Sequence, residues 1–100
     1  MIDVDVSEDA EADICHGIDY YESREDGLGV YFESSILTDL TSLEFLGGTH
    51  AMKYNLHRMP SKVFPFWIYY RMESAKSLTV IAIISQFRGD DYVSERLGSE

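Results

Sequence analysis

In the second half of the sequence, aromatic and basic residues occupy every second position of a short segment. This pattern is suited to binding phosphates, stacked bases or a partner peptide. Within Val63–Met72, Trp67, Tyr69 and Arg71 occupy every second position. In an extended strand such positions share one face of the sheet. Aromatic rings and cations there suit nucleic acid or a protein partner. The alternatives are that these side chains only shield an open sheet face, or that the register is shifted by one and Trp67 is core.

Further basic and polar residues could border the same face. Lys53, Asn55 and His57 alternate with apolar residues in the preceding segment, while Arg88 and Tyr92 follow the last apolar run. We therefore expect contact with a target or partner from a set of basic and aromatic residues: Lys53, His57, Lys62, Trp67, Tyr69, Arg71 and Arg88.

Other kinds of reactive site are not indicated by the sequence. The three histidines and the single cysteine, Cys15, lack the spacing of zinc ligands, so we expect no metal. The pairs Gly27/Gly29 and Gly47/Gly48 are typical of helix ends, and the motifs of phosphate-binding loops and nucleophile elbows are absent. We expect no cofactor either.

The charge is divided along the chain. The whole sequence has a net charge of −10, which argues against nucleic-acid binding driven by bulk charge. Residues 1–50 contain thirteen acidic residues and one basic residue, whereas residues 50–88 contain six basic residues and one acidic residue. Such asymmetry points to interaction surfaces, although the acidic half could equally be a solvated helix surface.

Length and composition predict one cytoplasmic domain over residues 1–100. An apolar content of 45% in 100 residues supports one two-layer core. One cysteine cannot form an intramolecular disulfide. The beginning of the sequence lacks the basic and apolar regions of a signal peptide, and the apolar runs are shorter than the ~18 residues of a membrane helix. We therefore expect no membrane association.

The apolar spacing changes period near the middle of the chain. It predicts a strand over Ile2–Val6, then two amphipathic helices, the first capped by Ser7 and the second running from Leu28 to Gly47. The short break between the two helices indicates an antiparallel helical hairpin. Beyond Gly48 the period becomes that of strands.

Three strands are predicted in this second half: Met52–His57, Val63–Met72 and Leu78–Ser85, with a short helix near Val93–Leu97. The order is β-α-α-β-β-β. The predicted fold is therefore α+β, with a helical hairpin packed on one face of a small, mainly antiparallel sheet. The side chains expected to face the helices are those of Phe64, Phe66, Ile68 and Tyr70.

The sequence resembles the RelE/ParE toxin superfamily. The resemblance is carried chiefly by Phe64-Pro65-Phe66-Trp67-Ile68-Tyr69-Tyr70-Arg71, followed by Val80-Ile81-Ala82-Ile83-Ile84, after a two-helix hairpin. Asp13-Ile14, Tyr20-Tyr21-Glu22 and Gly27-Leu28-Gly29 with Phe32 extend it into the helices. It is closer to the ParE, or plasmid-stabilisation, branch than to RelE.

This resemblance implies the toxin of a type II toxin–antitoxin pair, neutralised by a cognate antitoxin that wraps around it. In the ParE branch the implied target is DNA gyrase, which is inhibited by binding. In the RelE branch it is messenger RNA on the ribosome, cleaved by basic residues and an acid/base side chain.

The resemblance leaves open whether the protein is an enzyme. If it is an endoribonuclease, the candidate catalytic residues are Arg71, Arg88, Tyr92 and His57. Trp67 stands at a strand position where this superfamily often has an arginine, which favours the binding branch. A third reading is a non-toxic member of the superfamily that acts as a protein-interaction module.

Overall fold

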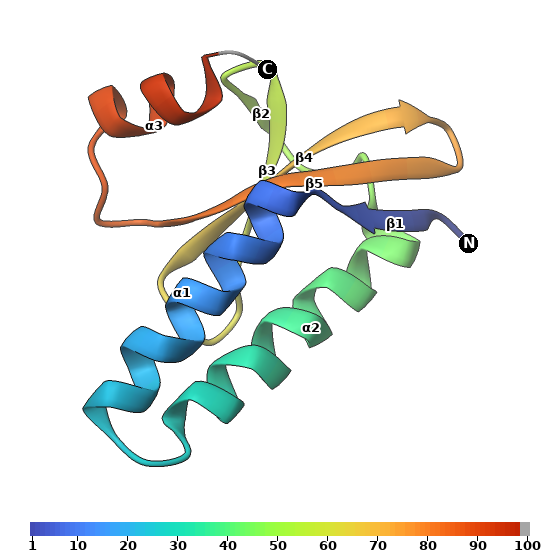
Figure 1. Ribbon diagram of the computed structural model, residues 1–100. Helices are drawn as coiled ribbons and strands as arrows, with labels where there is room; N and C mark the ends of the chain where they lie inside the picture. The colour runs from blue at the N-terminus through green and yellow to red at the C-terminus, as the bar shows by residue number, and fades with distance from the viewer. Residues whose placement is uncertain (99–100) are drawn as a thin grey trace.

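Two long helices cover one face of a five-stranded sheet, and a short helix covers part of the other face (Figure 1). The computed structural model describes residues 1–98. The helices are α1 (Glu8–Arg24), α2 (Leu28–Leu46) and α3 (Asp90–Leu97). The strands are β1 (Asp3–Val6), β2 (Met52–Lys53), β3 (Leu56–Pro60), β4 (Phe66–Ser74) and β5 (Ser77–Ser85).

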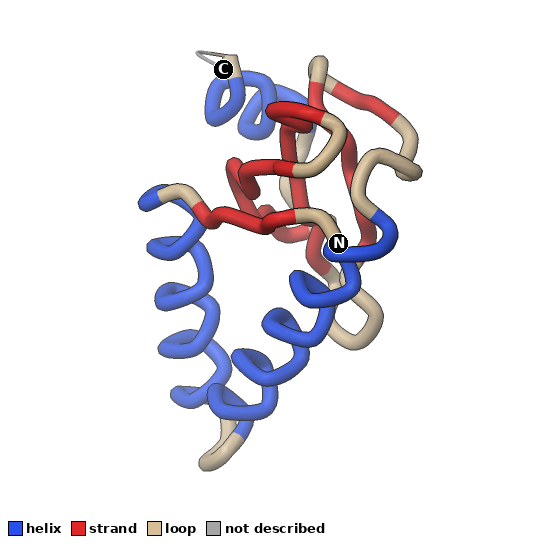
Figure 2. The backbone as a smooth tube through the Cα atoms, turned by 90° about the vertical axis from the view of Figure 1, so that its right-hand side faces the viewer, coloured by secondary structure: helices blue, strands red, loops and turns tan. Residues whose placement is uncertain are grey.

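The sheet has the order β1-β5-β4-β3-β2. Strand β1 pairs parallel to β5, while the other neighbours are antiparallel. The view turned by 90° shows the α1–α2 connection and α3 at opposite ends of the molecule (Figure 2). The predicted α+β class, with a helical hairpin on a mainly antiparallel sheet, is confirmed.

The helical hairpin is held together by local capping and by a close helix–helix contact. The Ser7 hydroxyl accepts a hydrogen bond from the Ala10 amide, which caps α1 as predicted. At the turn, the Glu22 carboxylate accepts hydrogen bonds from the amides of Gly27 and Gly29, each at 2.9 Å. A Cβ atom at Gly17 would lie 2.4 Å from the Phe32 ring, so this glycine permits the close approach of α2.

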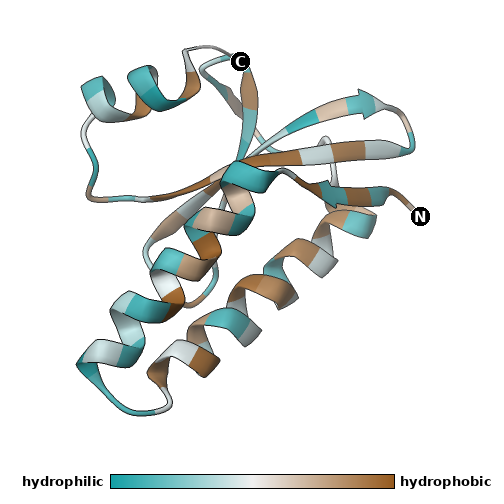
Figure 3. Ribbon diagram, viewed as in Figure 1, coloured by the Kyte–Doolittle hydropathy of each residue, from teal (hydrophilic) through white to brown (hydrophobic). Residues whose placement is uncertain are grey.

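The core between the hairpin and the sheet contains the side chains predicted to face the helices. Ile68 and Tyr70 of β4 are fully buried there, and Phe64 and Phe66 pack against Phe32. The helix α2 carries more hydrophobic residues than α1, although both also carry polar ones (Figure 3). The predicted orientation of β4, with Phe66, Ile68 and Tyr70 facing the helices, is therefore confirmed.

In the part of the chain that the structure describes, no helix combines the length and apolar character needed to cross a membrane.

The segment predicted as one strand over Met52–His57 is a tight hairpin. Tyr54 and Asn55 have φ values of 57° and 63°, in the left-handed region, and Lys53 pairs with Leu56. Two successive left-handed residues are the signature of a two-residue hairpin turn. The prediction was wrong because the polar–apolar alternation continues unbroken through this turn.

The second face of the sheet is partly covered by α3. Val93 and Leu97 pack there on a layer of buried sheet residues: Leu56, Tyr69, Ile81, Ala82 and Ile84. A register shift in β5 allows this layer, since Tyr69 pairs with Ala82 but Tyr70 pairs with Val80, so that Ile81 and Ala82 face the same side. The expectation that this face is open is therefore wrong where α3 lies.

Candidate functional site

The first turn of α3 is tied to the β2–β3 hairpin. The Tyr54 hydroxyl donates a hydrogen bond to Asp90 Oδ1 at 2.6 Å, and the Lys53 ammonium lies 3.9 Å from the same oxygen. The hydrogen bond from Tyr54 lowers the pKa of Asp90, and it raises the pKa of Tyr54. Lys53, a predicted contact residue, therefore lies beside the beginning of α3.

The last turn of α3 is tied to α1. Arg96 Nη2 lies 2.8 Å from Asp13 Oδ2, and both side chains are largely buried. The same Asp13 oxygen accepts a hydrogen bond from the Ile83 amide of β5 at 2.9 Å. The hydrogen bond to Asp13 raises the pKa of Arg96 despite its burial. Strand β1 pairs with β5 only as far as Val80. The Ile83 amide lies beyond the end of β1, and the Asp13 carboxylate accepts its hydrogen bond in place of a strand carbonyl.

The structure brings together Arg88 and Tyr92, two of the four candidate residues for an endoribonuclease. The Arg88 guanidinium lies 4.4 Å from the centre of the Tyr92 ring. Both residues border a groove between α1 and α3, which we call the α1–α3 groove. The residues that line it come from α1, from the beginning of β4, from the end of β5 with the following turn, and from α3, and they include Asp9, Ala12, Asp13, His16, Tyr20, Phe66, Ile84, Phe87, Arg88, Tyr92, Glu95 and Arg96.

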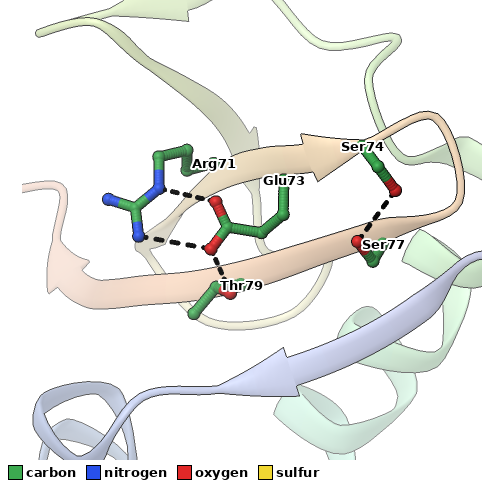
Figure 4. Close-up of polar contacts among 5 residues, drawn as sticks. All are labelled: Arg71, Glu73, Ser74, Ser77 and Thr79. Atoms are coloured by element: carbon green, nitrogen blue, oxygen red, sulfur yellow. Dashed lines mark hydrogen bonds and ion pairs between the residues drawn. The ribbon is translucent and has the colours of Figure 1, made fainter.

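Arg71 lies at the opposite end of the sheet from Arg88. It pairs with Thr79 across β4 and β5, near the hairpin that joins them, whereas Arg88 follows the far end of β5. The Arg71 guanidinium donates hydrogen bonds to both oxygens of Glu73, and the second oxygen also accepts from Thr79 (Figure 4). The hydrogen bond from Arg71 lowers the pKa of Glu73. Arg71 therefore belongs to a polar cluster with Glu73 and Thr79, which is separate from Arg88 and Tyr92.

His57 lies on the opposite face of the sheet from Trp67 and Arg71. It pairs with Tyr70, and the two rings stack with their centres 5.1 Å apart. Its Nδ1–H donates a hydrogen bond to the His50 carbonyl at 2.7 Å. The expected position beside Trp67 is therefore wrong, because the turn at residues 54–55 sets a register that the single-strand prediction did not contain.

Arg58 contacts Trp67 instead, and it was absent from the predicted set. Its guanidinium stacks 3.8 Å from the centre of the Trp67 ring. Arg58 pairs with Tyr69, so it lies next to Trp67 on the face that the sequence analysis assigned to aromatic and basic residues. Arg58 could have been identified from its pairing with Tyr69. That pairing can be predicted only when the hairpin turn is placed at Tyr54 and Asn55.

The remaining predicted contact residues differ in exposure. Tyr69 is 1% exposed and lies beneath α3, so its side chain does not reach the surface. Lys62 is exposed in the loop before β4, where its amide and the Ser61 hydroxyl donate hydrogen bonds to the buried carboxylate of Asp39 in α2. Trp67 and Arg71 are half-buried.

The described residues contain no cluster of side chains that could bind a metal. Within residues 1–98, no three residues among His, Cys, Asp and Glu are grouped so that they could hold one ion.

The fold is shared with a protein of known structure. No protein-family model and no curated protein sequence matches the chain. Among solved structures, a chain described as "Chromosomal ParDE TA system from P. aeruginosa" superimposes with a TM-score of 0.72. The match covers 85% of this chain and 96% of the other, at 16% sequence identity. The resemblance read from the sequence is thus confirmed at the level of the fold: this chain has the fold of a chain from a ParDE toxin–antitoxin system.

Proposed function

We propose that this protein is the toxin of a type II toxin–antitoxin system, that it acts by binding its target, and that a cognate antitoxin neutralises it. The shared fold with a chain from a ParDE system supports the class. The resemblance to the ParE branch makes DNA gyrase the proposed target. We expect both partners to meet the protein in the cytoplasm.

The observation that carries the binding mode is the separation of the four ribonuclease candidates. Arg88 and Tyr92 lie together, but Arg71 lies at the other end of the sheet and His57 lies on its other face. General acid–base cleavage requires the proton donor, the proton acceptor and the cations to reach a single phosphate. The four side chains do not converge on such a point, which favours binding over catalysis.

Expression of the protein without its antitoxin tests the class. We expect growth arrest, and we expect relief when the neighbouring small reading frame is expressed with it. Normal growth at a verified protein level would instead support a non-toxic interaction module.

The mode of action is tested with purified protein. We expect it to inhibit supercoiling by DNA gyrase and to leave messages on translating ribosomes uncut when their ends are mapped. Cleavage of the message that is lost in Arg88→Ala and retained in Lys76→Ala would contradict the binding mode and support the RelE-like reading. Lys76 is a suitable control because it is exposed in the β4–β5 turn, remote from Arg88.

A further inference from the structure

The α1–α3 groove consists of two adjoining hollows that share a common wall. Asp13, His16, Tyr92 and Arg96 line both of them. One hollow continues to Asp9 and Glu95, and the other continues to Tyr20, Phe66 and Phe87. The two hollows therefore form one continuous groove along the seam between the helices.

The two ends of this groove differ in charge and polarity. Asp9 and Glu95 are exposed carboxylates at one end. At the other end the floor is apolar where Phe66 and Ile84 line it from opposite faces of the sheet, and the exposed Arg88 lines the same hollow. Within residues 1–98, no carboxylate lies within ion-pair distance of the Arg88 guanidinium.

An exposed aromatic side chain marks the apolar end. Phe87 is 85% exposed beside this floor, although burying such a ring is worth about 1.5–3 kcal/mol. Tyr20 is 52% exposed on the opposite rim. An apolar side chain from a partner that enters between these two rings would remove apolar surface from water on both sides.

The length of the groove limits the length of its occupant. From Asp9 to Tyr20 the helix α1 advances by roughly 16 Å at ~1.5 Å per residue. An extended chain covers that distance with about five residues at ~3.3 Å each.

We propose that the α1–α3 groove binds an extended segment of about five residues from the antitoxin. The segment places a basic residue between Asp9 and Glu95, and an aliphatic or aromatic anchor on the apolar floor with an acidic residue beside it at Arg88. This assignment rests on the proposed function, which supplies the antitoxin as partner. Nucleic acid fits the groove less well, because the carboxylates at one end repel a phosphate backbone.

Labelled synthetic peptides test the groove without knowledge of the antitoxin sequence. The matched peptides are lysine-serine-serine-leucine-aspartate and the same sequence reversed, since both chain directions satisfy the proposal. The swapped peptides exchange lysine and aspartate, so that the basic residue is next to the leucine. Fluorescence anisotropy at low salt should show that one matched peptide binds about tenfold more tightly than either swapped peptide, because two attractive contacts replace two repulsive ones.

Charge reversal in the protein gives a second, independent readout. Arg88→Glu should invert the preference at that end, and Phe87→Ala should weaken all four peptides while leaving the charge preference intact. Lys76→Glu is the matched control: it makes the same charge change in the β4–β5 turn and should leave the preference unchanged. Circular dichroism checks that each variant is folded.

The outcomes separate this inference from the proposed function. Equal binding of matched and swapped peptides, including no binding of either, overturns the groove assignment even when the protein arrests growth. A clear preference that Arg88→Glu and Lys76→Glu alter alike also overturns it. A preference that Arg88→Glu inverts and Lys76→Glu leaves unchanged supports it, and absence of growth arrest would then count against the proposed function alone.

Discussion

The Asp13 carboxylate links α1 to two segments that follow it by 70 and 83 residues, namely the Ile83 amide and the Arg96 guanidinium. One side chain thus joins the first helix, the central part of the sheet and the last helix. Both hydrogen bonds are shorter than 3 Å, and Asp13 is 11% exposed. The position of α3 over the sheet therefore depends on a residue near the beginning of the chain.

Replacing Asp13 should destabilise the fold. Asp13→Ala leaves the buried Ile83 amide without its acceptor and removes the carboxylate that faces Arg96, so we expect a loss of about 2–4 kcal/mol in the free energy of unfolding. Asp13→Asn retains an acceptor for the Ile83 amide and should lose less. Urea denaturation followed by circular dichroism measures both. Asp19→Ala on the exposed side of α1 is the control, and an equal effect there would contradict the role given to Asp13.

The stability of the fold should fall on mild acidification. Tyr70 accepts a hydrogen bond from the Gly48 amide at 2.9 Å, and its hydroxyl lies 2.6 Å from His50 Nδ1. Burial, with a smaller contribution from His57, lowers the pKa of His50. The unfolded state therefore binds more protons than the folded state near this pKa, so stability is full above the ordinary histidine pKa and falls as the pH decreases through the lowered value.

Denaturation midpoints compared at about pH 7 and about pH 5 test this dependence. In His50→Asn, which keeps an acceptor near the Nδ1 position but does not titrate, the decrease should be smaller than in the unmodified protein. His16→Asn, in the exposed part of α1, should leave it unchanged. Identical pH dependence in all three proteins would show that His50 is not responsible.

Truncation of the core should have large effects. Ile36 and Ile68 are both fully buried between the hairpin and the sheet, so Ile36→Ala and Ile68→Ala should each cost about 2–5 kcal/mol. Val30→Ala is the control. Because Val30 is 64% exposed on α2, this change should lower the free energy of unfolding far less. Near-neutral results at both isoleucines would contradict the two-layer core.

The only tryptophan reports on the contact with Arg58. The guanidinium covers one face of the Trp67 ring, and the ring also packs against the core beneath α3. Arg58→Ala should expose the ring, shift its emission to longer wavelength and increase quenching by acrylamide. Arg71→Ala, four residues further along β4 on the same face, should leave quenching unchanged. An unaltered signal in Arg58→Ala would contradict the stacked geometry.

The hairpin of helices and the orientation of β4 could be predicted because each depends on spacing within one element. Ala10 and Ile14 recur at the helical period, and Ile68 and Tyr70 recur at the strand period, and all four are buried. Packing between layers then follows from which face is apolar.

The positions of His57, Arg58 and Tyr69 could not be predicted, because they depend on pairing between elements. A turn made by Tyr54 and Asn55 has none of the usual glycine signals, so the register of β3 was not visible in the sequence. Likewise, Val93 and Leu97 are two apolar residues in a polar helix, which is too weak a pattern to show that α3 covers Tyr69.

Tyr54 is an unusual residue for a left-handed turn position, where glycine or asparagine avoids steric strain. Its hydroxyl, however, is the group that holds Asp90. A change of Tyr54 to glycine would relax the turn and release the beginning of α3 at the same time. The backbone strain at residue 54 and the attachment of the last helix are therefore coupled through one side chain, and a substitution that removes the strain also removes the hydrogen bond to Asp90.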